Sequence, residues 1–151
     1  MQTEQTPFRA FENAPTSFAR CFNDECPLSA QCLRCFVGQN EQGQPAIGLC
    51  VYPFDATAAI CPHFRDVAKV QMAWGFDPLF HDVLERHATA LRRRLFSYCG
   101  TETAYYRYNR GDKHLTPAQQ QDILAIFAEY GYDPATLAFA HYADEYNFYD
   151  A

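Results

Sequence analysis

The chain has 151 residues, a formal net charge of −6 and seven cysteines. This length suits one domain that buries a hydrophobic core without disulfide bonds. It contains no apolar run long enough for a signal peptide or a membrane span, so we expect a cytoplasmic protein with no membrane partner. In a reducing compartment, clustered cysteines bind metal or react more often than they form disulfides, and an odd count weakens a fully paired framework.

The first third of the chain is weak in periodic apolar pattern. Residues 1–19 are polar and contain two prolines, which predicts a flexible arm ahead of a single domain over residues 20–151. Within that domain, residues 20–64 form a cysteine-rich subregion. The segments "AIGLCVY" (46–52) and "KVQMAWGF" (69–76) are rich in strand-forming residues and predict short strands.

The second half of the chain predicts helices and one further strand. Apolar residues at the 3.6-residue period predict a helix over 78–98, and Gly100 is its expected end. "TAYYRY" (103–108) predicts a strand. Thr116, Pro117 and Gln119 form an N-cap, a first-turn proline and a capping-box glutamine, which predict a helix over 117–130. Asp133 and Pro134 predict a last helix over 134–142. The expected fold class is therefore α+β, with a short sheet and three helices in the C-terminal half.

Charge is distributed unevenly along the chain. Residues 114–151 hold six carboxylates and no Lys or Arg, whereas residues 86–113 hold seven cationic side chains against two carboxylates, a net charge of +5. Aromatic rings beside arginines can stack bases or hold phosphates. The candidate residues for anion or nucleic-acid binding are Arg92, Arg93, Arg94, Tyr106, Arg107, Tyr108 and Arg110. The alternative, which we prefer, is a sheet with one core face and amphipathic tyrosines at its rim.

The stretch "CFNDECPLSAQCLRC" (21–35) places Cys21, Cys26, Cys32 and Cys35 within fifteen positions. Zinc takes four tetrahedral ligands and thiolates suit it, while short spacing keeps the loop entropy of each added ligand small. "CPHF" (61–64) offers Cys61 and His63 as further ligands. Two alternatives remain: inert buried thiols and an iron–sulfur cluster. For Cys50 and Cys99, which lie in apolar segments, we expect buried thiols.

The sequence contains no catalytic constellation. It has no P-loop, no dinucleotide-binding fingerprint and no G-x-S-x-G elbow, so no residue is a candidate for catalysis. We expect His87, on the apolar helix stripe, to be a core histidine. The first hypothesis is therefore a non-enzymatic, metal-stabilised module that binds another protein. The second is a nucleic-acid or anionic-ligand binder that uses residues 86–113, and the weakest is a thiol-dependent enzyme.

The cysteine stretch, "CPHF", "YYRYNRG" and "LTPAQQQDILAIFAEYGY" together resemble an uncharacterised bacterial family, known only as a domain of unknown function. The resemblance covers residues 18–148 and implies no activity. The family pattern C…CP…CLR…CP maps onto Cys21, Cys26, Cys32 and Cys61. We therefore predict one structural zinc held by these four residues, with Cys35 and His63 as the other candidate ligands.

Overall fold

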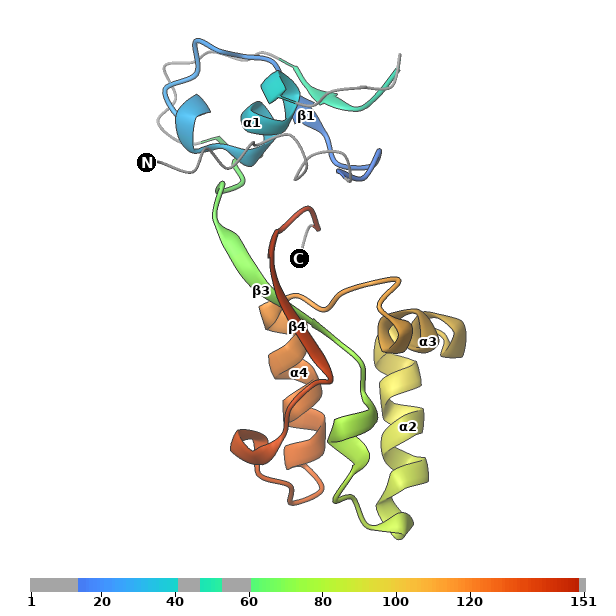
Figure 1. The fold of residues 1–151 in the computed structure, drawn as a ribbon. Coiled ribbons are helices and arrows are strands. Elements are labelled where there is room, and N and C mark those ends of the chain that lie inside the picture. The colour runs from blue at the N-terminus through green and yellow to red at the C-terminus, as the bar shows by residue number, and fades with distance from the viewer. Residues whose placement is uncertain (1–13, 41–46, 53–60, 150–151) are drawn as a thin grey trace, which may run out of the picture. The chain divides into compact units, whose positions relative to one another are not determined.

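The computed structural model describes residues 14–40, 47–52 and 61–149. Contacts group them into two compact units, a first unit up to Lys69 that also takes in Tyr146 and the residues after it, and a second unit of residues 70–145. Figure 1 shows helices together with short strands, so the expected α+β class is confirmed. Among the described residues, no helix is long and apolar enough to cross a membrane.

The first unit is built from short elements. These are β1 (Arg20–Cys21), the 3₁₀ helix η2 (Ser29–Gln31), α1 (Leu33–Asn40) and β2 (Cys50–Val51). Strand β1 pairs with β2 in parallel, so the strand predicted over 46–52 is real but only two residues long within the described segment.

The described residues of the first unit form a small apolar core. Phe18, Leu33 and Val37 are buried together, and the Phe148 ring meets Phe18 edge-on at 5.2 Å between centroids. The arm expected over residues 1–19 therefore has an anchored end at Phe18, while residues 1–13 lie outside the described residues.

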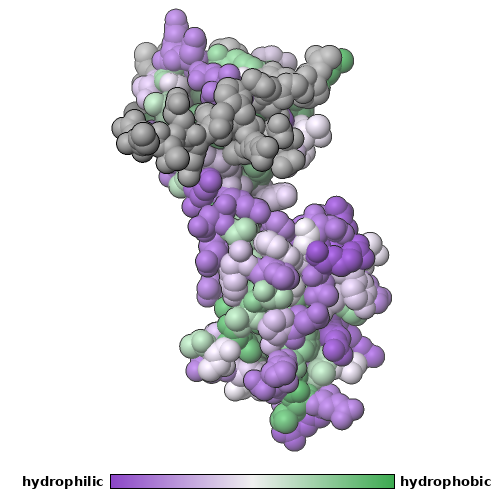
Figure 2. Space-filling view, in the orientation of Figure 1, coloured by the Kyte–Doolittle hydropathy of each residue, from purple (hydrophilic) through white to green (hydrophobic). Residues whose placement is uncertain are grey.

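The second unit holds most of the regular structure. Its elements are β3 (Lys69–Trp74), η3 (Asp77–Phe80), α2 (Glu85–Cys99), α3 (Glu102–Arg110), α4 (Pro117–Ala128), η4 (Pro134–Thr136) and β4 (His141–Tyr146), and β3 pairs with β4. The core between them contains Phe76, Leu91, Leu95 and Phe127, all with no exposed surface. In the face shown in Figure 2, hydrophilic side chains cover much of this unit.

The predicted 78–98 helix exists but begins later. Pro78 lies in the first turn of η3, and Leu84 is extended at φ −63° and ψ 137°, so α2 begins at Glu85. Leu91 and Leu95 point into the core as the period predicted. Gly100, at φ 93°, follows the last helical residue as expected.

The prediction of a strand over 103–108 is wrong, because this segment is the helix α3. The side chain of Thr101 accepts the N–H of Ala104 at 3.0 Å, and Gly111 ends the helix at φ 88°. These caps and the burial of one ring, Tyr105, outweigh the strand propensity of tyrosine. Tyr105 stacks on Phe76 with centroids 4.7 Å apart.

The prediction of a helix over 134–142 is also wrong. Asp133 does cap a helical turn, since its side chain accepts the N–H of Ala135, but that turn is only the 3₁₀ helix η4. The chain then extends because pairing with β3 offers backbone partners: the Ala140 N–H donates to the Gly75 carbonyl at 3.0 Å. Phe139, the residue before Ala140, is buried.

The helix α4 begins as predicted. The Thr116 side chain accepts the Gln119 N–H, and the Gln119 side chain accepts the Thr116 N–H, which is a complete capping box with Pro117 at the first position. Ile123 and Phe127 are fully buried on its inner face.

We predict that Thr116→Ala lowers the free energy of unfolding of the second unit by about 1 kcal/mol, through loss of the cap. Phe127→Ala should cost about 3–5 kcal/mol, because the ring is completely buried. Urea unfolding followed by circular dichroism measures both, with Thr116→Ser, which keeps the acceptor, as the matched control. Equal small losses for the alanine variants would contradict this packing.

Candidate metal centre

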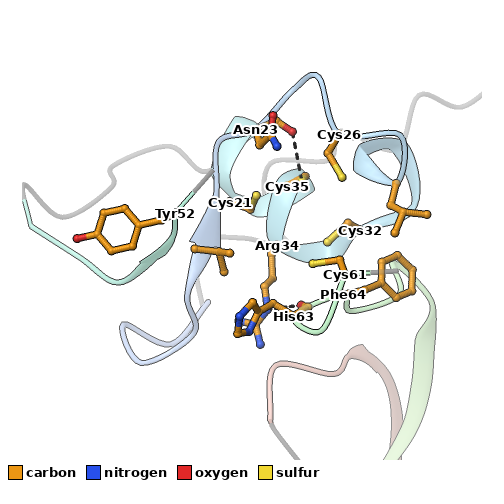
Figure 3. A pocket seen from close by; sticks show the side chains of 12 residues that line it. Cys21, Asn23, Cys26, Cys32, Arg34, Cys35, Tyr52, Cys61, His63 and Phe64 are labelled. Carbon is orange, nitrogen blue, oxygen red and sulfur yellow. Dashed lines mark hydrogen bonds between the residues drawn. The ribbon is translucent and has the colours of Figure 1, made fainter. Parts of the chain in front are cut away.

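Five of the seven cysteines line one small pocket in the first unit. Its lining includes Cys21, Cys26, Cys32, Cys35 and Cys61, together with His63 and Arg34. The centre of a water-sized body has about 20 Å³ in which to move, which is enough for one such body. In Figure 3 the five sulfur atoms lie around one space, whereas the His63 ring lies beside Arg34, away from them. Every cysteine predicted as a ligand is therefore present at this pocket.

Two Cys-Pro turns present thiols to the pocket. In the first, the Cys26 carbonyl accepts the N–H of Ser29 at 2.9 Å; in the second, the Cys61 carbonyl accepts the N–H of Phe64 at 3.1 Å. Each is a four-residue turn with proline at its second position, where the fixed φ of proline favours the turn. The two turns thus hold their cysteines in the same local way.

Backbone pairing brings the second turn to the helix α1. Cys32 forms an antiparallel bridge with Asp66, and the Val67 N–H donates to the Gln31 carbonyl at 3.1 Å. The segment that follows Cys61 is therefore fixed beside the start of α1, although the two are about thirty residues apart in the sequence.

The Arg34 side chain forms hydrogen bonds that link two other segments to α1. Its Nε donates to the His63 carbonyl at 2.8 Å and its Nη1 donates to the Ala19 carbonyl at 3.0 Å. The guanidinium also lies 4.5 Å from the centre of the Phe18 ring. Arg34 is 8% exposed. Sequence reasoning missed this residue, and its only signal was a cation placed between two clustered cysteines.

Gly38 permits α1 to approach β1 closely. A Cβ at this position would lie 2.5 Å from the backbone oxygen of Cys21. Because Gly38 is one helical turn beyond Cys35, the close approach places Cys35 next to Cys21. The sequence alone did not single out Gly38, since the need for a missing side chain arises only from the packed strand.

The thiol of Cys35 interacts with those of Cys21 and Cys32. Burial raises the pKa of the Cys35 thiol far above its usual value, and hydrogen bonding to Cys21 and Cys32 and their negative charge raise it further. All seven cysteines are free thiols. Within the described ranges, no three Cys, His, Asp or Glu side chains are already arranged around a metal position. To bind a metal ion, these side chains therefore have to move.

The remaining predicted residues have separate environments. Cys50 is exposed, so its expected burial is wrong, because β2 is a short strand with an exposed face. Cys99 is partly buried, and burial raises its pKa to about 11. His87 hydrogen-bonds through Nδ1 to the hydroxyl of Tyr132 at 2.8 Å, as expected of a core histidine.

The basic residues of the second unit lie on helices and have different neighbours. Arg92 lies over the Phe80 ring at 5.0 Å, while Arg94 pairs with Glu129 at 2.7 Å. On α3, the helical geometry turns Tyr106 and Tyr108 about 200° apart, so they do not share the face that a strand would give them. Arg92, Arg93, Arg94, Arg107 and Arg110 are exposed, and Arg110 pairs with Asp112 at 2.9 Å. That these residues together form one anion-binding site therefore stays a prediction from the sequence.

A family model described as a family of unknown function (DUF6078) matches residues 1–148, so the expected membership of an uncharacterised family is confirmed. No curated protein matches the chain. No solved structure matches it either.

We predict that iodoacetamide modifies Cys50 much faster than Cys99 at pH 8, because Cys50 is exposed and the raised pKa of Cys99 leaves little reactive thiolate. The rate at Cys99 should keep rising up to about pH 11. Peptide mass spectrometry of reduced protein measures both rates, and urea-unfolded protein is the control in which the difference should vanish. Equal rates in the folded protein at pH 8 would contradict the burial of Cys99.

Proposed function

Since the chain belongs to a family of unknown function (DUF6078), we propose from its own geometry that it is a non-enzymatic cytoplasmic binding module whose first unit is held together by one zinc ion. The observation that carries the proposal is the convergence of five cysteine side chains on one pocket. They come from β1, from both Cys-Pro turns and from the start of α1. Chance burial of inert thiols gives no reason for separate segments to direct them to the same space.

The chemistry of the side chains favours a single zinc ion. Zinc needs only four ligands, at about 2.0–2.3 Å, and thiolates suit it. An iron–sulfur cluster needs several iron and sulfide atoms inside its thiolate cage. The pocket holds at least one water-sized body, and its cysteines can supply all four zinc ligands.

The proposed ligands are Cys21, Cys26, Cys32 and Cys61. Cys35 competes for a place among them because it is buried in contact with Cys21 and Cys32. His63 is the weaker candidate, since its ring is exposed and lies away from the sulfur atoms. Four protein ligands leave no open position for substrate, so the metal would be structural and not catalytic.

The small core of the first unit gives the metal a physical role. Among its described residues, Phe18, Leu33 and Val37 form the buried apolar cluster. A structural zinc ion contributes folding free energy to such a domain, because the site does not exist in the unfolded chain. The partner that we propose is another protein, and exposed Phe22 and Tyr52, on or beside the paired strands β1 and β2, offer it apolar contacts.

We predict that purified, reduced protein contains one zinc ion per chain by elemental analysis. Cys26→Ser should lose the metal, because it removes one of four thiolate ligands. Cys99→Ser is the matched control and should keep it, since Cys99 packs against the core of the second unit and does not line the pocket. A series with Cys35→Ser, Cys61→Ser and His63→Ala then identifies the fourth ligand. Folded wild-type protein without zinc or iron would overturn the proposal and leave these residues as buried thiols.

A further inference from the structure

Trp74, the only tryptophan in the chain, stacks with two histidine rings in the second unit. The His114 ring stacks on its indole with centroids 4.1 Å apart and planes 11° apart. The His141 ring stacks at 5.2 Å and 26°. The three rings come from β3, β4 and the connection between α3 and α4, so the stack joins elements that are distant in sequence.

Both ring nitrogens of His114 face hydrogen-bond acceptors. Nδ1 is 2.9 Å from the Glu145 Oε2 atom, and Nε2 is 3.1 Å from the Gly111 carbonyl oxygen. A carboxylate and a carbonyl accept but do not donate. A neutral imidazole has one N–H and can make one of these bonds, whereas an imidazolium has two N–H groups and makes both.

We propose that His114 is a proton-operated latch. When its ring takes up a second proton, the imidazolium donates to Glu145 and to the Gly111 carbonyl, and its charge lies over the face of the Trp74 indole. Both effects favour the charged ring, through a charge-assisted hydrogen bond and a cation–π contact. When the proton leaves, one of the two hydrogen bonds is lost. Histidine is the side chain that gains or loses a proton most readily near neutral pH, which suits it to such a role.

Among the charged groups near His114, Glu145 is the carboxylate that faces its ring. On the same connection, Asp112 pairs with Arg110 at 2.9 Å, and the Lys113 ammonium lies 5.7 Å from the centre of the Tyr108 ring. The first turn of α4 has no acidic residue.

The two strands contribute few other charges. On β4, His141 stacks on Trp74, and exposed Asp144 points to the opposite face of the strand from Glu145. On β3, the Lys69 ammonium lies 5.4 Å from the Tyr146 ring, at the other end of the strand from Trp74. His141 is therefore the second titratable ring in the stack, and it requires its own control.

The latch fixes the end of β4 that belongs to the second unit. Glu145 is the last residue of that unit on this strand. On the other side, Gly111 lies so close to Trp74 that a Cβ there would be 2.8 Å from the indole Nε1 atom. Protonated His114 thus joins the end of α3, strand β3 and strand β4. After deprotonation the ring can keep its hydrogen bond to Gly111 or to Glu145 but not both, so it no longer links the end of α3 to β4 through hydrogen bonds.

Tryptophan emission tests the latch directly, because the chain has one indole and a cationic imidazole in contact with it quenches fluorescence. We expect emission of the full-length protein to fall in one step as pH is lowered from 8 to 5. His114→Gln should abolish that step, and His141→Gln should leave it. Glu145→Gln removes the negative partner and should move the step to lower pH. Circular dichroism confirms that each variant is folded.

Two results would overturn the latch: wild-type emission that does not change between pH 5 and 8, or a step that survives in His114→Gln and disappears in His141→Gln. If His114→Gln does not fold, long-range ¹⁵N correlation spectra of the wild-type protein at pH 5.5 decide the matter. Two protonated ring nitrogens on His114 are expected, and a neutral ring with one N–H contradicts the proposal.

Discussion

The guanidinium of Arg34 is the contact on which the candidate metal centre depends. A buried cation is costly unless its N–H groups are satisfied, and Arg34 satisfies them with carbonyls from two other segments. The Ala19 carbonyl fixes the approach to Cys21, and the His63 carbonyl fixes the turn that carries Cys61. Because Arg34 itself lies between Cys32 and Cys35, one side chain sets the relative positions of all these thiols. Its positive charge at the pocket also offsets the negative charge that four thiolates would bring to a zinc ion.

The two units have different sources of stability. The second unit has helices packed around fully buried side chains such as Phe76, Leu91 and Phe127. The first unit has a two-residue parallel pairing, one short helix and a small apolar cluster. Hydrophobic burial scales with the apolar area removed from water, so among the described residues it supports the second unit more than the first. Hydrogen bonds such as those of Arg34, and in our proposal the metal, add to the stability that apolar burial gives the first unit.

Sequence patterns predicted the features that depend on neighbouring residues. The capping box at Thr116 and Gln119 is local, and so is the glycine that ends α2. The cysteines over 21–35 were singled out because their spacing is short, and Cys61 because of the family resemblance. These residues line one pocket, and their binding of a metal stays a prediction. The helix α3 and the strand β4 were missed because the choice between helix and strand depends there on tertiary contacts, namely the burial of Tyr105 and the pairing of Ala140 with Gly75. Arg34 and Gly38 were missed for the same reason, since their partners lie in other segments.

The central claim is that metal binding holds the first unit together while the second unit folds on its own core. Amide hydrogen exchange of the full-length protein, with bound zinc and after chelation, tests it most directly. We expect chelation to accelerate exchange in α1 and around Cys61, to leave α2 and α4 protected, and to be reversed by added zinc. Unchanged protection of α1 in verified metal-free protein, or equal loss of protection in both units, would contradict the account.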